Sequence, residues 1–288
     1  MVVFIQERPP TSFDPAIADY YDRAPEESRL EYGAFRLEEI RTRELIERHA
    51  PPAPATVLDV GGAAGAYAFW LAERGYDVHL VDATPRLVAE ARRRNGHAAK
   101  RLASCQVGDA RSIPADDDSA ALVLMLGPLY HLVEARDRQL ALREAARVLR
   151  PGGTLVAAAI SRWASALDGL ARDLFQDSRF ADIVEQDVRT GQHRNSTERV
   201  DYFTTAYFHE PEKLRSEVET AGFTVEGLYG VEGPGWILPD LAERWTDAAR
   251  RATLLHVARL LESEPSVLGS SAHLIVVGRN EVLRANEP

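Results

Sequence analysis

The stretch VLDVGGAAGAYAFWL, residues 57–71, constrains the fold of this chain more than any other part of the sequence. An apolar run broken only by Asp59 predicts a strand, the glycine and alanine run after it predicts a tight turn, and residues 66–71 favour a helix. In such a strand-turn-helix the N–H groups at the helix N-terminus face a ligand, and glycine lets that ligand approach closely. The stretch predicts a nucleotide-like ligand, with an ordinary strand-to-helix turn as the alternative.

The spacing of the small residues separates two kinds of nucleotide site. A dinucleotide-binding loop has the pattern G-x-G-x-x-G/A, and here Ala63 stands where its second glycine belongs. The pattern D-x-G-x-G-x-G fits better, with Asp59, Gly61 and Gly65 in place. This loop resembles the first motif of the class I (Rossmann-like) S-adenosylmethionine-dependent methyltransferases, in their bacterial small-molecule type. Because a methyl group is a small intrusion, we expect cofactor binding to survive Ala63.

Two further acidic residues follow expected strands. Residues 77–82 predict a strand that ends at Asp82, 21 residues after Gly61, the offset at which an acid meets ribose hydroxyls, although an aspartate here could also cap the next helix. Residues 104–107 predict a third strand, and Asp109 after it matches the adenine-binding acid of the family. The resemblance implies S-adenosylmethionine as the cofactor and S-adenosylhomocysteine as its product. The residues expected to bind the cofactor are Asp59, Gly61, Gly62, Ala63, Gly65, Asp82, Ala83, Asp109, Ala110, Leu126 and Gly127.

The chain from residue 57 to residue 160 matches the family's order of landmarks. Residues 121–126 are fully apolar, as expected for a parallel strand covered on both faces, and RVLRPGG precedes a strand at residues 154–160. Helices are expected at residues 84–95, 139–149, 211–221 and 241–261, and the last two strands at 223–229 and 272–277. The resemblance implies an α/β fold with a doubly wound, mostly parallel seven-stranded sheet whose last strand is antiparallel.

Two segments are expected to add to this sheet. Residues 1–50 would form an N-terminal helical cap, with a helix at 33–49, and residues 51–288 would form the cofactor-binding domain. Within that domain, residues 161–200 do not follow the strand-helix alternation. We interpret them as an inserted lid, the lid segment below.

The candidate catalytic residues follow from the chemistry of methyl transfer. The reaction is an in-line displacement, so the protein contributes alignment, exclusion of water and, for a protonated nucleophile, a base. His131 is the first candidate for that base and His209 the second, with Tyr130 and Tyr21 to orient the acceptor; the alternative for each is packing. The residues expected to bind the acceptor are Tyr20, Trp163, Tyr207, Phe208 and Trp236.

Other kinds of site and partner are disfavoured. No histidines lie at i, i+4 and none has carboxylates at ligand spacing, so no metal site is expected. A formal net charge of −10 disfavours nucleic acid as a partner, and no apolar run has the length of a membrane span, so no membrane partner is expected. With one cysteine and no secretion signal, the protein is expected to be cytoplasmic. The oligomeric state stays open, with a homodimer as the alternative to a monomer.

The sequence therefore predicts a methyltransferase of secondary metabolism that acts on C, N or O of a small aromatic acceptor such as an indole or a phenol. Two alternatives remain. A non-methylating protein of the same fold would hold the cofactor only as a structural element and steer another reaction. An NAD-dependent oxidoreductase would share the strand-turn-helix and Asp82, but the missing second glycine and Asp109 disfavour it.

Overall fold

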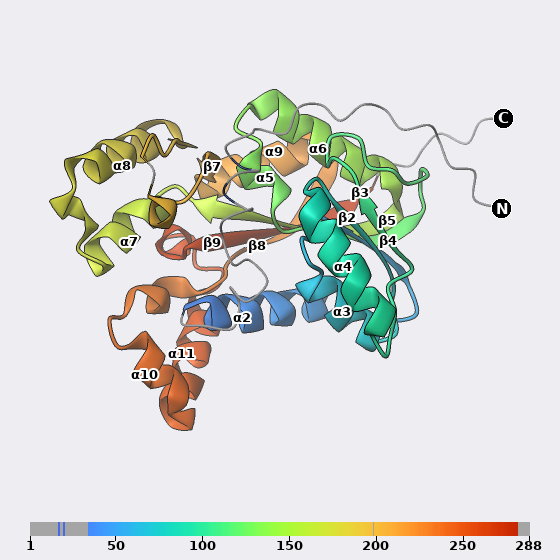
Figure 1. Cartoon of the computed structure of the whole chain (residues 1–288), viewed down its shortest axis with the longest axis horizontal. Helices are drawn as coiled ribbons and strands as arrows, with labels where there is room; N and C mark the ends of the chain where they lie inside the picture. Colours follow the sequence, from blue (N-terminus) through green and yellow to red (C-terminus); the bar gives the residue numbers. More distant parts are fainter. Residues whose placement is uncertain (1–16, 18–19, 21–33, 198, 282–288) are drawn as a thin grey trace.

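The computed structural model describes residues 17, 20, 34–197 and 199–281, and its strands and helices alternate through the first half of the chain (Figure 1). Up to the central strand, the elements are α2 (Ala34–His49), β1 (Thr56–Val60), α3 (Ala66–Glu73), β2 (Asp77–Asp82), α4 (Pro85–His97), β3 (Ser104–Val107), β4 (Ala120–Met125), α5 (Pro128–His131), α6 (Ala135–Val148) and β5 (Leu149–Ser161). After it come α7 (Ala164–Ala171), η2 (Leu174–Gln176), α8 (Ser178–Thr190), β6 (Gln192–His193), η3 (Val200–Tyr202), β7 (Ala206–His209), α9 (Pro211–Thr220), β8 (Phe223–Gly230), η4 (Gly233–Ile237), α10 (Leu241–Thr246), α11 (Ala248–Leu261), η5 (Leu268–Ser270) and β9 (His273–Asn280).

The main sheet has the strand order β3-β2-β1-β4-β5-β9-β8. The pairs from β3 to β5 are all parallel, while β9 runs antiparallel to both β5 and β8. The predicted doubly wound sheet with an antiparallel last strand is therefore confirmed. Because strands β1 to β5 are parallel, their carboxyl ends meet at one edge, called the carboxyl edge below, where open α/β sheets bind their ligands.

Two short strands extend the sheet beyond the prediction. The pairing of β4 with β5 ends at Met125 and Ala157, but β5 continues to Ser161. There β7 pairs in parallel with Ile160 and Ser161, and β6 runs antiparallel to β7. The segment between β5 and β7 therefore leaves from and returns to the same end of β5.

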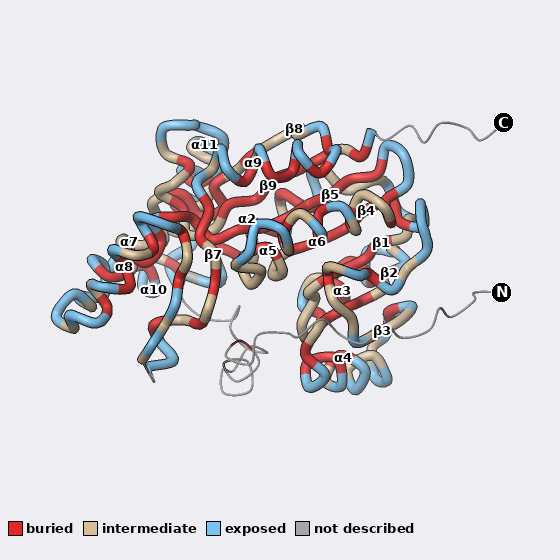
Figure 2. Tube along the Cα trace, turned by 90° about the horizontal axis from the view of Figure 1, so that it is seen from above, coloured by how far each residue is buried: buried red, intermediate tan, exposed pale blue. Residues whose placement is uncertain are grey.

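The sheet separates two apolar cores, because successive strand residues point to opposite faces. In β9, Leu274 and Val276 pack with α5, α6 and α9, whereas Ile275 and Val277 pack with α2, α3 and α4. Figure 2 shows this burial as a band that runs through the strands, with exposed residues on the outer sides of the helices. Both faces of the parallel strands are covered, which explains why β4 is apolar at every position.

Two helices differ from the prediction. Helix α4 continues through Asn95 to His97 because the Asn95 amide bonds both the N–H and the carbonyl of Leu102 instead of ending the helix. The helix expected at residues 241–261 is two helices, α10 and α11. Asp247 divides them, since its extended backbone interrupts the helix and its carboxylate accepts the N–H groups of Ala249 and Arg250.

The lid segment carries helices α7 and α8, which lie beside the sheet at the left of Figure 1. A buried hydrogen-bond network joins α7, α8 and β6 within this segment. The Asp187 carboxylate accepts from the Ser165 hydroxyl at 2.6 Å and lies 2.8 Å from Nδ1 of His193. Nε2 of His193 lies 2.8 Å from the carbonyl oxygen of Tyr202. Within the described ranges, no helix combines the length and the apolar composition that crossing a membrane requires.

Candidate functional site

A cavity of about 330 Å³ opens at the carboxyl edge of the sheet. Its walls are the loops that follow β1, β2, β3 and β4, together with α5 and single residues from the N-terminal segment and the lid segment. The lining residues are Ile17, Asp59, Gly61–Ala64, Ala66, Tyr67, Asp82–Thr84, Leu87, Arg94, Gly108–Arg111, Leu126–Pro128, Tyr130–Glu134, Asp137 and Arg194. Every predicted cofactor residue except Gly65 is among them.

The loop after β1 needs glycine for two different reasons. Gly61 and Gly65 have φ angles of 75° and 88°, in the left-handed region that side chains disfavour. A Cβ on Gly61 would also lie 2.5 Å from Cδ of Pro128, and one on Gly62 would lie 2.6 Å from Oδ2 of Asp59. The loop therefore packs directly against the start of α5 and against the Asp59 carboxylate, and a side chain at Gly61 or Gly62 would displace them.

Ala63 occupies a position that the loop shapes for glycine. Its φ angle is 48°, and its N–H donates to Oδ2 of Asp82 at 2.8 Å. A left-handed conformation costs a non-glycine residue about 1–2 kcal/mol. Alanine in place of the motif's glycine is therefore accommodated with backbone strain, while the hydrogen bond to Asp82 keeps the loop in place.

Two aspartates lie buried side by side beneath the loop. Asp82 is 7% exposed, and each of its oxygens accepts one backbone N–H, from Ala63 and from Thr84. Asp59 is 1% exposed, and its Oδ2 is a buried oxygen with no hydrogen-bond partner among the described residues. Burial, and then the nearby Asp82 carboxylate, raise the pKa of Asp59 to about 7, and burial also raises that of Asp82. The cavity thus contains a carboxyl group whose charge a bound cation would stabilise.

The third predicted acid is held by an arginine. Asp109 accepts Nε and Nη2 of Arg111 at 3.0 and 2.7 Å, and Arg111 also donates to Asp137 at 2.7 Å. Both aspartates and Arg111 line the cavity. The ion pair fixes the Asp109 carboxylate in the loop after β3. Because a carboxylate oxygen can accept more than one hydrogen bond, Asp109 can still accept one from a ligand.

Two of the predicted catalytic residues lie in α5 at the cavity wall. Tyr130 and His131 both line the cavity, and their rings meet edge to face with centroids 4.7 Å apart. The His131 ring also stacks on Phe203 at 6.0 Å. Burial lowers the pKa of His131 to about 4 against the opposing effect of a hydrogen bond with the backbone of Thr205. His131 is therefore uncharged at neutral pH.

The structure places His209 elsewhere. This side chain is fully buried, and its Nε2 lies 3.3 Å from Oε2 of Glu217, which is paired with Arg138. Burial lowers the pKa of His209 despite that carboxylate.

Tyr207 lies under Arg138, with the guanidinium carbon 3.7 Å from the ring centroid, and Phe208 is buried against His193. His209, Tyr207 and Phe208 do not line the cavity, because strand β7 directs them into packing.

The remaining predicted acceptor residues, Trp163, Trp236 and Tyr20, are not among the residues that line the cavity. Trp163 packs over Gly269 and is 37% exposed, and Trp236 donates Nε1–H to the carbonyl oxygen of Ser270 at 2.8 Å. The ring of Tyr20 meets Phe203 edge to face, and Tyr21 lies outside the described residues. Arg94 and Arg194 line the cavity from α4 and from the lid segment, and neither belongs to a motif by which the sequence could have indicated it.

Another group of polar side chains lies outside the cavity lining. Glu38, Glu232 and His273 come together although 194 and 41 residues separate them in sequence. No local spacing could have revealed this cluster, so the sequence does not predict a metal site here. Their atoms have the chemistry of metal ligands.

Comparison with known proteins identifies the cavity-bearing part of the chain. Residues 57–153 match the family model of a methyltransferase domain. An uncharacterised methyltransferase of Mycobacterium tuberculosis is 38% identical over 112 residues, 39% of this chain and 42% of the relative. The methyltransferase GfsG of Streptomyces halstedii is 32% identical over 167 residues, 52% of this chain and 59% of the relative. The ubiquinone/menaquinone biosynthesis C-methyltransferase UbiE of Paracoccus denitrificans is 37% identical over 116 residues, which are 39% of this chain and 45% of the relative. The chain thus spans about half the length of these curated relatives.

Solved structures share the fold over most of the chain. An S-adenosylmethionine-dependent methyltransferase from Methanosarcina mazei has a TM-score of 0.56 at 15% identity, over 82% of this chain and 96% of its own. The [4+2]-cyclase SpnF has a TM-score of 0.52 at 18% identity, over 85% and 81%. At these identities the likeness concerns the fold alone.

Proposed function

We propose that this chain is a class I S-adenosylmethionine-dependent methyltransferase that transfers a methyl group from that cofactor to a small molecule; the match of residues 57–153 to a methyltransferase domain supports this proposal. The observation that carries the proposal is the cavity at the carboxyl edge, where the glycine loop lies beside three carboxyl groups: Asp59, Asp82 and Asp109. When bound, the cofactor supplies a methyl group on a positively charged sulfur.

The charge of the cavity fits this cofactor better than a dinucleotide. The unpartnered oxygen of Asp59 suits a cationic ligand, which would stabilise its ionised form. Five carboxyl groups line the cavity, from Asp59, Asp82, Asp109, Glu134 and Asp137, against three arginines. Two of those carboxylates, Asp109 and Asp137, already hold Arg111. A pyrophosphate would meet an excess of negative charge here, which argues against the NAD-dependent alternative.

The chain's own residues would bind, align and exclude water. In this proposal Asp82 accepts the ribose hydroxyls and Asp109 accepts the exocyclic amine of the adenine, as the family resemblance implies. The bare backbone of Gly61 and Gly62 lets the ligand lie close to the loop. Tyr130 and His131 would face the acceptor from α5. With its lowered pKa, His131 stays neutral and accepts a hydrogen bond from the acceptor, which makes it a positioning group and a weak base.

For the acceptor, we propose a small, largely flat aromatic metabolite such as an indole or a phenol. One relative, UbiE, is named for a step in quinone biosynthesis, which supports a small-molecule acceptor for this chain. Trp163 lies two residues after the end of β5 and is more than a third exposed. Trp236, with its indole N–H bound to the chain, offers a second flat surface from η4. The methylated atom of the acceptor, C, N or O, is identified from the product of the methyl-transfer assay.

The cofactor part is tested by titration calorimetry with S-adenosylhomocysteine, with NAD as the comparison ligand. We expect binding in the micromolar range, weakened at least about tenfold in Asp82→Ala, since hydrogen bonds to a charged group contribute about 1.5–3 kcal/mol each. Asp116→Ala is the matched control, because this aspartate is exposed and lies outside the cavity lining. Binding of NAD but not of S-adenosylhomocysteine would overturn the proposal.

The methyl-transfer part is tested by incubating the protein and S-adenosylmethionine with a panel of indoles and phenols and following products by mass spectrometry. Formation of a product heavier by one CH₂ unit, with release of S-adenosylhomocysteine, is the expected result. Methylation of tRNA with no small-molecule product would contradict the acceptor class. A cofactor that binds and is never consumed would favour the non-methylating alternative.

A further inference from the structure

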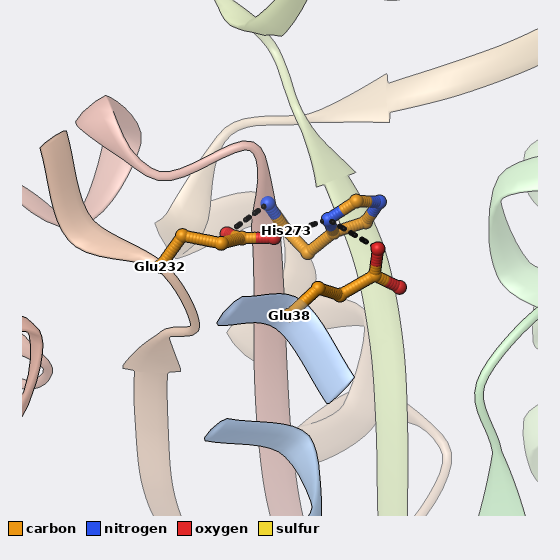
Figure 3. Close-up of side chains that lie close together, drawn as sticks. All are labelled: Glu38, Glu232 and His273. Atoms are coloured by element: carbon orange, nitrogen blue, oxygen red, sulfur yellow. Dashed lines mark hydrogen bonds and ion pairs between the residues drawn. The ribbon is translucent and has the colours of Figure 1, made fainter. Parts of the chain in front are cut away.

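Three side chains that are typical metal ligands meet on the α2 face of the sheet, outside the proposed methyl-transfer site. Figure 3 shows Glu38 on α2, Glu232 after β8 and His273 at the start of β9, all pointing toward one another. Nδ1 of His273 lies 2.6 Å from Oε1 of Glu232 and 3.9 Å from Oε2 of Glu38. One ligand atom from each residue lies within 4.8 Å of the others. We propose that Glu38, Glu232 and His273 bind one divalent transition-metal ion.

The central ligand is held in position by its neighbours. Oε2 of Glu232 accepts the Ser271 hydroxyl at 2.5 Å and the His273 N–H at 3.0 Å. The Ser271 oxygen in turn accepts the N–H of Glu232 at 2.8 Å. Oε1 of Glu232 is thereby directed toward the imidazole, so two of the three ligands already converge. Such supporting hydrogen bonds orient metal ligands and raise their basicity.

The charges around Glu232 favour a bound cation. This carboxylate is 2% exposed, and among the described residues its hydrogen-bond partners are Ser271 and His273, neither of which has a permanent charge. Arg41, three residues after Glu38 on α2, donates its Nε–H to the Val231 carbonyl while its other nitrogens pair with Glu44 and Glu262. Burying a carboxylate beside a second carboxylate is costly without a cation, and a divalent ion would remove that cost.

The donor set selects the class of ion. One imidazole nitrogen and two carboxylate oxygens suit Zn²⁺, Mn²⁺, Fe²⁺, Co²⁺ or Ni²⁺, whereas Mg²⁺ and Ca²⁺ prefer oxygen ligands alone. The ion takes the place of the proton on Nδ1 of His273; that proton passes to solvent and no electron is transferred. Three protein ligands leave coordination positions for water, as in metal sites that act on a ligand.

The site lies at the same edge of the sheet as the cavity. His273 pairs with Ile160 one residue before β5 ends, and β5 ends at the residue before Arg162 and Trp163. A bound ion would therefore lie at the carboxyl edge, on the face that α2 covers. The proposal concerns metal binding itself and does not depend on the methyl-transfer reaction.

The experiment titrates chelator-treated protein with zinc chloride in a calorimeter and with cobalt chloride in a spectrophotometer. We expect one equivalent of Zn²⁺ to bind and the visible absorption of Co²⁺ to change with the same stoichiometry. His273→Gln and Glu38→Gln should each weaken binding at least about tenfold, since even the loss of a supporting residue costs 10–100-fold. Mg²⁺, titrated as magnesium chloride, should bind at least about tenfold more weakly than Zn²⁺.

Folding and surface binding are controlled separately. Thermal melting shows whether each variant is folded, and glutamine keeps the size of both replaced side chains close to the original. His79→Gln removes a partly exposed imidazole on β2, beside Asp77, and should leave zinc binding unchanged. Absence of saturable zinc and cobalt binding by the folded wild-type protein would overturn the proposal. Equal zinc affinity in wild type and in both ligand variants would also overturn it.

Discussion

At the scale of single residues, Asp59 couples ligand binding to protons. Its pKa of about 7 means that the carboxyl group is mostly protonated below that value in the protein without ligand. A cationic ligand favours the ionised form, so binding below pH 7 must release this proton. Affinity should therefore fall as the pH decreases below 7 and level off above it.

Calorimetry with S-adenosylmethionine, which carries the positively charged sulfur, at pH 6 and pH 8 tests this coupling. We expect binding up to about tenfold weaker at pH 6, since one pH unit below the pKa leaves about a tenth of the groups ionised. Asp59→Asn should remove the difference. His131 does not contribute in this range, because its pKa is about 4. An unchanged pH dependence in Asp59→Asn would assign the effect to another group.

Ala63 gives a stability prediction with an unusual sign. Glycine adopts the left-handed conformation of this position without strain, although it loses more backbone entropy on folding. Ala63→Gly should raise the free energy of unfolding by about 0.5–1 kcal/mol, or the melting temperature by roughly 1–4 °C. Ala72→Gly in α3 is the control and should destabilise by about 1 kcal/mol or more. A lower melting temperature in Ala63→Gly would show that the loop is not strained at this position.

The residues of the cavity could be predicted where one short pattern contains them. Asp59 and Asp82 lie near the ends of β1 and β2, and Gly61 and Asp109 lie just after β1 and β3, so periodicity and spacing locate them. The cluster of Glu38, Glu232 and His273 could not be predicted, because it depends on three elements that meet only in the folded chain. His209, the second candidate base, is buried in the structure beside Glu217, a contact that no local pattern in the sequence indicates.

At the scale of elements, one buried ion pair joins α6 to α9. Arg138 is 1% exposed and Glu217 is 4% exposed, with Nε to Oε2 at 2.8 Å. Arg138 also donates to the carbonyl oxygens of Leu132 and Val133, in the loop that lines the cavity. The pair therefore supports both the packing of two helices and one wall of the site.

Removing the negative partner should be costly. Glu217→Gln leaves Arg138 buried without its counter-charge, and we expect the free energy of unfolding to fall by about 3–5 kcal/mol in urea denaturation. Glu212→Gln on the same helix is the control, because its side chain is 78% exposed and should change stability by less than about 0.5 kcal/mol. Equal effects of the two variants would contradict the role given to the pair.

The same pair predicts acid sensitivity. Burial opposes ionisation of Glu217, but Arg138 and His209 outweigh it and lower the pKa to about 2 from a usual 4.5. A lowered carboxyl pKa contributes stability above pH 4.5 that is lost as the pH falls toward 2. Glu217→Gln should therefore flatten the decrease in stability across that range, as measured by urea denaturation at several pH values.

At the scale of the whole molecule, the main sheet could be predicted from the sequence and its extension by β6 and β7 could not. The parallel strands have strong signals: apolar runs, glycine turns and helices with regular spacing. Strands β6 and β7 have two and four residues, too few to show a period, and they form only because β5 extends beyond β4. The break between α10 and α11 depends on Asp247 as a cap, which competes with an otherwise continuous helical pattern.

The way in which β7 returns to β5 has a consequence for the history and the engineering of such chains. Residues 162–205 leave the sheet at Ser161 and come back beside it, where Arg162 N–H donates to the His209 carbonyl at 2.8 Å. The matched methyltransferase domain ends earlier, at residue 153. A segment whose two ends are neighbours can be exchanged as one unit, because its junctions do not change the strand order of the sheet that receives it. Under the proposed function, exchange of residues 162–205 at these junctions would change the acceptor while the matched domain, residues 57–153, stays the same.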